Sequence, residues 1–189
     1  MQTTFRELMT ALHGMGFGGL LLLAFSGALI ELHRICAPER SSPLSAWERR
    51  FLRRYLIATA VLAWGAVLSG AYIVYPWYRA RLPQGVVDLA GYPQRSLLAS
   101  TATSEWHNLG MEWKEHVAWF APIAMTMVAY VFIKYRSDLT RNRPVRSAAF
   151  AFTVAAFVAA GIAGTFGALI NKNAPVQGGA LIKIMGETK

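Results

Sequence analysis

Residues 147–170 read SAAFAFTVAAFVAAGIAGTFGALI and contain no ionisable side chain. The hydrocarbon core of a bilayer is about 30 Å thick, and a helix crosses it with roughly 20 mostly apolar residues. Three further segments of this kind occur at about 10–32, 55–76 and 117–134. Their apolar runs lack the alternation of membrane strands. The pattern predicts an all-α, integral membrane bundle of four helices that forms a single domain, 1–189.

The composition excludes several other classes of protein. Only 15% of the 189 residues are charged and 54% are hydrophobic, whereas an ordinary soluble domain has about 25% charged residues. The net charge is +9, but the basic residues lie in short connections between apolar segments, so we expect no nucleic-acid partner. The single Cys36 excludes a disulfide framework, a centre built from several cysteines and a covalently attached c-type haem.

The distribution of Lys and Arg predicts the orientation of the chain. Eleven of the 19 lie in two short connections, 31–55 and 134–146. The positive-inside rule places these connections in the cytoplasm. Both termini, the long loop 77–116 between helices 2 and 3, and the tail 171–189 are then on the outer, periplasmic side. The predicted location is the bacterial cytoplasmic (inner) membrane, with the lipid bilayer as the first partner.

Three of the four histidines lie at one predicted membrane level. His13 is near the outer end of the first segment, and His107 and His116 precede the third. A titratable group at membrane depth is costly, and is by default a functional hypothesis. Two imidazoles on separate helices can ligate a b-type haem from opposite faces. The sequence therefore predicts haem b near the outer leaflet, ligated by His13 and His116, with His107 and Met111 as an alternative ligand set.

Small and cationic residues near these histidines extend the predicted haem site. Three glycines follow His13 on the same segment: Gly14, Gly16 and Gly18. Glycines on one face of a helix allow a flat macrocycle to approach the backbone closely. The same glycines can instead allow two helices to pack closely. Three cations occur near the outer ends of the segments: Arg79, Arg81 and Lys114. We expect these cations to pair with haem propionates.

Two short stretches carry a resemblance to other proteins. They are YPWYRARL at Tyr75–Leu82 and MEWKEHVAWF at Met111–Phe120. They resemble the Y-P-x-Y-R and K-E-H segments of small four-helix bacterial membrane proteins of uncharacterised function. The plan of histidines at the ends of four membrane helices also resembles membrane-anchored b-type cytochrome subunits. The first resemblance implies an outer polar cluster made of Tyr75, Pro76, Tyr78, Arg79, Lys114, Glu115 and His116.

Two functions of different class follow from these features. The first is a cytochrome b-like electron-transfer subunit, which passes electrons between the quinone pool and a membrane partner or a periplasmic cytochrome. Such a chain is a subunit of a respiratory or photosynthetic redox complex and not an enzyme on its own. The alternative is a cofactor-free accessory or scaffold subunit of a larger membrane complex. Motifs of hydrolytic catalysis or phosphate binding, such as H-E-x-x-H, do not occur in the sequence.

Overall fold

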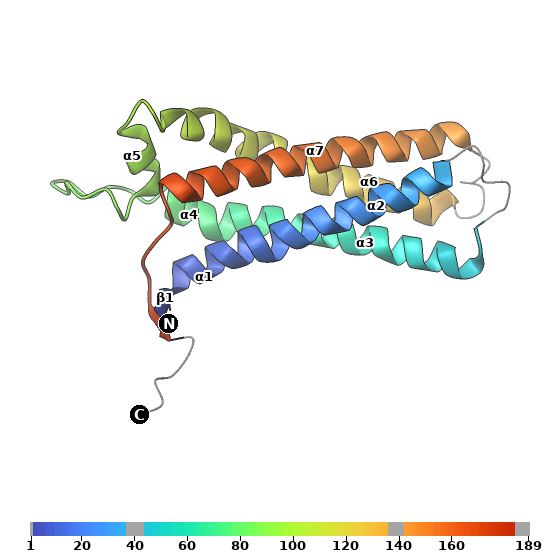
Figure 1. Cartoon of the computed structure of the whole chain (residues 1–189), viewed down its shortest axis with the longest axis horizontal. Coiled ribbons are helices and arrows are strands. Elements are labelled where there is room, and N and C mark those ends of the chain that lie inside the picture. The colour runs from blue at the N-terminus through green and yellow to red at the C-terminus, as the bar shows by residue number, and fades with distance from the viewer. Residues whose placement is uncertain (1, 37–43, 136–141, 184–189) are drawn as a thin grey trace.

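Four long helical rods lie side by side and form one bundle (Figure 1). The structure is a computed structural model, and it describes residues 2–36, 44–135 and 142–183. Each rod is long and apolar enough to cross a membrane. We name the rods span 1 (Phe5–Cys36), span 2 (Ala46–Tyr78), span 3 (Trp106–Tyr135) and span 4 (Arg143–Asn173). The chain is therefore an all-α, multi-pass membrane protein, as the apolar segments predict.

Three of the spans combine α-helical segments with π-helical ones, which are labelled η. Span 1 consists of α1 (Phe5–Ala11), η1 (Leu12–Gly19) and α2 (Leu20–Cys36). Span 2 consists of α3 (Ala46–Ser69), η2 (Gly70–Val74) and α4 (Tyr75–Tyr78). Span 3 consists of η3 (Trp106–Met111), η4 (Trp113–Val117) and α6 (Phe120–Tyr135), and span 4 is the single helix α7 (Arg143–Asn173). Outside the spans lie the short helix α5 (Pro93–Leu98) and the strands β1 (Gln2–Thr4) and β2 (Leu181–Lys183).

All four spans are longer than the apolar segments that predict them. Span 2, for example, begins at Ala46 and not near residue 55. Its start is fixed by a capping box, in which Ser45 Oγ accepts a hydrogen bond from Glu48 N at 3.1 Å and Glu48 Oε2 accepts one from Ser45 N at 2.8 Å. Such a cap provides hydrogen-bond partners for the free backbone N–H groups at the start of a helix. A helix can therefore begin within a polar stretch, before its apolar segment. Apolar content locates the part of a helix in lipid, and the caps locate its ends.

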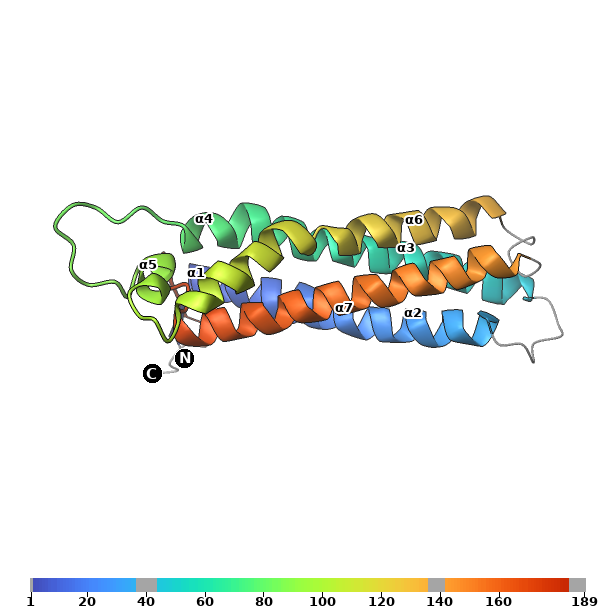
Figure 2. The ribbon, with the colours of Figure 1, turned by 90° about the horizontal axis from the view of Figure 1, so that it is seen from above.

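The long connection between spans 2 and 3 is also shorter than the predicted loop 77–116. The chain is helical again from Trp106, and this helix continues into α6 along the bundle (Figure 2). β1 and β2 pair antiparallel at the same end of the bundle as this connection (Figure 1). We call this end the loop end, and the end where α3 begins the arginine end. Parts of the predicted connections 31–55 and 134–146, and of the tail, lie outside the described residues.

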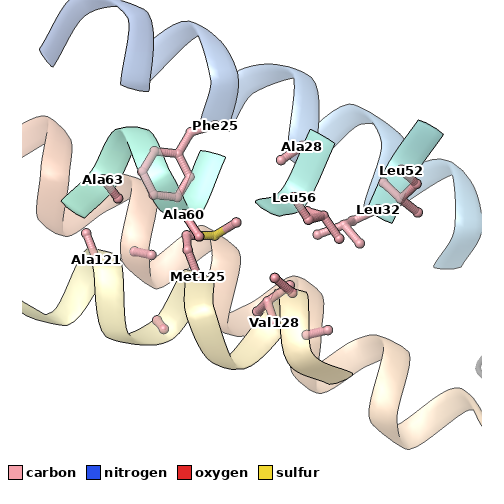
Figure 3. Close-up of a cluster of buried hydrophobic side chains, with 14 of the residues drawn as sticks. Phe25, Ala28, Leu32, Leu52, Leu56, Ala60, Ala63, Ala121, Met125 and Val128 are labelled. Carbon is pink, nitrogen blue, oxygen red and sulfur yellow. The ribbon is translucent and has the colours of Figure 1, made fainter. Parts of the chain in front are cut away.

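The main apolar core lies in the part of the bundle towards the arginine end. α2 packs against α3 and α7, and α6 packs against the same two helices. The largest fully buried side chains of this cluster include Phe25, Leu32, Leu56, Met125 and Val128 (Figure 3). Alanines from all four spans fill the remaining positions, which allows the helix backbones to approach closely.

A second, smaller apolar cluster lies at the loop end. Its buried members are Tyr78, Leu97, Met111, Ile170, Ala174 and Val176. Between the two clusters, each span has a stretch that contributes to neither: residues 5–16, 67–73, 112–119 and 161–169. The apolar core is therefore interrupted at one level of the bundle. Most of the π-helical residues of spans 1, 2 and 3 lie at or beside this level.

Candidate functional site

Polar side chains from three spans occupy the level where the apolar core is interrupted. They are His13 in η1, Ser69 at the end of α3 and Lys114 in η4. Backbone atoms of span 4 complete the set, at Ala163. We call these residues the interhelical polar site. π-helical turns are rare and occur frequently at functional sites, so their presence in the three spans that supply these side chains agrees with a functional role.

The hydrogen bonds of Ser69 determine which nitrogen of His13 carries the proton. His13 Nδ1 lies 2.9 Å from Ser69 Oγ, and this hydroxyl donates its only hydrogen to the Ala66 carbonyl at 3.1 Å. Because the hydroxyl has no second hydrogen, it accepts from His13 Nδ1–H. In a neutral imidazole the proton is then on Nδ1, and Nε2 keeps a lone pair. In this tautomer His13 can coordinate a metal ion or accept a hydrogen bond through Nε2.

The His13 ring also makes a close contact with the backbone of span 2. A Cβ atom at Gly70 would lie 2.8 Å from His13 Cε1 and 3.2 Å from Nε2. Glycine is therefore the residue that admits the ring at this position. Together with the Ser69 hydrogen bond, this contact fixes the orientation of the imidazole between spans 1 and 2.

Lys114 extends from span 3 against the small residues of span 4. Its Nζ lies 3.4 Å from the Ala163 carbonyl, and a Cβ atom at Gly167 would lie 3.0 Å from Nζ. Within the described residues, this carbonyl is the hydrogen-bond partner of the ammonium group and no carboxylate pairs with it. A cation at membrane depth normally has a counter-charge or lines a polar cavity. Lys114 therefore has capacity to bind a ligand that carries negative charge or carbonyl oxygens.

A second polar group, the loop-end network, lies nearer the end of the bundle. Tyr78 is 3% exposed, and its hydroxyl lies 2.7 Å from His107 Nδ1. Gln94 Nε2 lies 3.4 Å from His107 Nε2. Arg79 forms an ion pair with Glu115 at 3.4 Å, and its guanidinium carbon lies 5.2 Å from the centre of the Tyr75 ring. The network joins the end of span 2 to α5 and the start of span 3.

The structure does not bring His116 to His13. The His116 side chain is 70% exposed, and its Nδ1 lies 3.1 Å from the backbone oxygen and 3.4 Å from the carboxylate of Glu112, one turn earlier. Lys114 points into the bundle, and a residue two positions later on a helix faces nearly the opposite way. The predicted pairing of His13 with His116 on one iron therefore stays a prediction that these contacts do not support.

The alternative ligand pair, His107 and Met111, lies on one helix, but both side chains already have partners. His107 has a hydrogen-bond partner at each ring nitrogen, whereas Met111 is buried in the second apolar cluster. Among the described residues, no group of three His, Cys, Asp or Glu side chains is placed to hold a metal ion. Of the predicted ligands inside the bundle, His13 is thus the one with a ring nitrogen, Nε2, that has no hydrogen bond among the described residues; this nitrogen lies beside Gly70 of span 2.

The predicted glycines and cations occupy varied environments. A Cβ atom at Gly14 would meet nothing within 4 Å, and the nearest atoms to Cβ atoms at Gly16 and Gly18 would belong to span 1 itself. These three glycines are therefore not the positions where spans touch.

The predicted cations lie in three different environments. Arg79 belongs to the loop-end network, and Arg81 is exposed in the connection after α4. Of the predicted cations, Lys114 is the one at the interhelical polar site.

Sequence reasoning missed Ser69 and Gly70 as parts of the site. Ser69 and Gly70 did offer a signal, since a Ser-Gly pair within an apolar helix is a common place for irregular helix geometry. Gly167 belongs to a small face of span 4 together with Gly161 and Gly164, but the pattern does not say which side chain of span 3 faces it.

Comparisons with models of protein families, with curated proteins and with solved structures give no match to this chain. The resemblances noted from the sequence therefore stay expectations. The arguments for a function come from the geometry of the two polar groups.

Proposed function

We propose that the chain is an electron-transfer subunit of a membrane redox complex and that it holds one b-type haem at the interhelical polar site. The observation that carries the proposal is the hydrogen-bond order from His13 to Ser69 to Ala66, which keeps the proton on Nδ1 and leaves Nε2, beside the backbone of Gly70, without a hydrogen bond among the described residues. Metal-ligating histidines commonly donate their other N–H to a neighbouring acceptor, which orients the ring. His13 has this arrangement.

Lys114 supports the same proposal. A haem brings two propionates, and an ammonium group at hydrogen-bond distance stabilises a carboxylate through a charge-assisted bond. Within the described residues Lys114 has only a backbone carbonyl, 3.4 Å away. A propionate would supply the missing counter-charge. The His13 imidazole, the Ser69 hydroxyl and the Ala163 carbonyl are the polar groups that would surround a propionate at this level.

The number of axial ligands distinguishes two forms of the proposal. One protein imidazole is enough to hold a b-type haem, as in globins. With His13 alone, one axial position stays open and the reduced haem binds carbon monoxide. With both His13 and His116, the two axial positions are filled, and His116 must turn inward from its exposed position. The contacts of His116 favour the first form.

An absorption spectrum of the protein purified from haem-replete membranes tests the proposal. We expect a Soret band that shifts when carbon monoxide is added to the reduced protein. His13→Ala removes the band, whereas the matched control His116→Ala retains it. A folded, colourless wild-type protein, or a band that His13→Ala leaves unchanged, contradicts the proposal.

The proposal extends to the partners on either side of the haem. The site lies in the half of the bundle nearer the loop end, and we propose that electrons pass there between the quinone pool and a partner on the periplasmic side. The bacterial cytoplasmic membrane is the proposed location, because the positive-inside rule places the arginine end in the cytoplasm.

The second candidate is the cofactor-free accessory subunit of a larger membrane complex. The exposed position of His116 and the two occupied nitrogens of His107 favour it, because they leave one imidazole free in the interior. This candidate predicts a colourless chain that co-purifies with larger membrane subunits. It also predicts that His13→Ala leaves co-purification unchanged.

A further inference from the structure

A groove at the arginine end lies between the start of α3 and the end of α6. It has a volume of about 290 Å³ and is lined by Leu44, Ala46, Arg49, Arg50, Leu52, Arg53 and Phe132. We propose that this arginine groove binds the headgroup of an anionic phospholipid. The proposal does not depend on the haem, because the groove lies at the opposite end of the bundle from the loop-end network.

The charges of the groove are unbalanced. Among the described residues, its lining has three arginines and no acidic side chain. Arg49 donates a hydrogen bond to the Leu44 carbonyl, and Arg50 and Arg53 have neither a hydrogen bond nor an ion pair among the residues that the structure describes. A guanidinium binds phosphate oxygens through two parallel N–H groups. The groove therefore offers donors with the geometry and charge that a phosphodiester requires.

A neighbouring cavity shows the opposite arrangement. It has a volume of about 230 Å³, and Glu31 and Glu48 line it together with Arg34. Arg34 pairs with Glu31 at 2.8 Å and with Glu48 at 3.4 Å. Cations at the arginine end are thus neutralised by carboxylates on one side of α3 and left without them in the groove. This contrast points to an external anion as the partner of Arg50 and Arg53.

The apolar surroundings of the groove favour a lipid over a free phosphate ion. Leu52 is 2% exposed at the groove wall, and Phe132 packs against the core from α6. Ile57 and Val61 follow Arg50 by seven and eleven residues, so they lie on the same face of the helix. These two side chains are 39% and 64% exposed. If the arginines bind the phosphate of a phospholipid, its acyl chains would therefore lie along an apolar face of span 2.

The depth of the arginines agrees with a headgroup. Arg49, Arg50 and Arg53 lie in the first two turns of α3, which begins at Ala46. Clusters of basic residues at the start of a membrane helix lie at the level of lipid phosphates, and basic cavities between such helices bind anionic headgroups. The groove thus places its cations where phospholipid phosphates are concentrated.

Lipid binding to the purified full chain tests the proposal. The protein is titrated with phosphatidylglycerol, diphosphatidylglycerol or phosphatidylcholine, and bound lipid is counted by native mass spectrometry. We expect both anionic lipids to bind and phosphatidylcholine not to. Arg50→Gln with Arg53→Gln lowers the affinity for anionic lipid about 25-fold, at about fivefold for each arginine.

The matched control removes the same charge elsewhere at this end. Arg54 and Arg143 are exposed and do not line the groove, so Arg54→Gln with Arg143→Gln keeps the affinity within about twofold. Arg50→Gln alone, at an exposed position, gives about a fivefold loss if the double variant folds poorly. Equal losses in both double variants, equal binding of phosphatidylcholine, or full displacement of the lipid by millimolar inorganic phosphate would each overturn the proposal.

Discussion

Ser69 determines the chemistry available to His13, although it would not touch a bound cofactor. Its hydroxyl accepts from His13 Nδ1 and donates to the Ala66 carbonyl. Removing the hydroxyl frees the imidazole to exchange its proton between nitrogens and to rotate. Loss of such a supporting hydrogen bond typically lowers metal affinity by about 10- to 100-fold.

We therefore expect Ser69→Ala to lower haem retention by at least about tenfold while the protein stays folded. The measurement is haem content per protein after dialysis against a haem-binding competitor. Ser26→Ala is the control, because Ser26 Oγ donates to the Leu22 carbonyl of its own helix and lies in α2, away from the site. Equal retention by the two variants would contradict the role assigned to Ser69.

Gly70 illustrates a steric requirement at the same residue scale. A Cβ atom there would lie 2.8 Å from His13 Cε1, so Gly70→Ala must displace the ring or separate spans 1 and 2. Overpacking of this kind destabilises a folded protein by about 1–3 kcal/mol. We expect a lower melting temperature by circular dichroism in detergent. Gly161→Ala is the control, since a Cβ atom at that position meets nothing within 4 Å, and its melting temperature stays unchanged.

At the scale of the elements, the number and order of the spans follow from the sequence. An apolar stretch as long as a bilayer is thick has few alternatives to a membrane helix. The ends of the spans do not follow from apolar content, because capping residues such as Ser45 fix them outside the lipid-like stretch. Apolar content places the start of span 3 near residue 117, since the turns of η3 and η4 mix polar and aromatic residues. The scarcity of Pro and Gly before that point nevertheless allows a helix that runs into span 3.

The site could be predicted only in part, for a reason that also lies in the elements. The sequence places Lys114 and His116 on one helical approach, but does not say which of the two faces the interior. The choice depends on span 4, where Gly167 leaves room for Nζ of Lys114. The same lack of long-range information hid the contact between Tyr78 and His107, which are 29 residues apart.

The side chains of the loop-end network attach the long connection between spans 2 and 3 to the bundle. Tyr78→Phe removes a hydroxyl that is buried and bonded to His107 at 2.7 Å, and leaves a ring nitrogen without its partner. We expect a loss of about 1–3 kcal/mol in local stability, seen as faster hydrogen exchange in α5 and η3. Tyr72→Phe is the control, because Tyr72 is 73% exposed, and its exchange rates match those of the wild type. Equal exchange in the two variants would show that the hydroxyl does not secure the connection.

At the scale of the whole molecule, the bundle has two apolar clusters, and between them lies a polar level formed by the side chains of His13, Ser69 and Lys114 and by the Ala163 carbonyl. Lys114 is the least compensated group there, since its hydrogen-bond partner among the described residues is the Ala163 carbonyl at 3.4 Å. Replacing a poorly compensated interior charge with an apolar side chain of similar size is often stabilising. If Lys114 serves to bind a ligand, replacing it with an apolar side chain should therefore raise the stability of the ligand-free protein and weaken ligand binding.

Lys114→Met tests this prediction. We expect a higher melting temperature for the haem-free protein, because the uncompensated ammonium is gone, and a lower haem content, because a propionate loses its counter-charge. Lys134→Met provides the control, since Lys134 is exposed at the arginine end with its Nζ 5.7 Å from the centre of the Tyr130 ring, and it changes neither quantity appreciably. A lower melting temperature with unchanged haem content would instead mean that Lys114 is a packing residue that secures span 3 to span 4. The polar level would then belong to the architecture of the bundle and not to a bound cofactor.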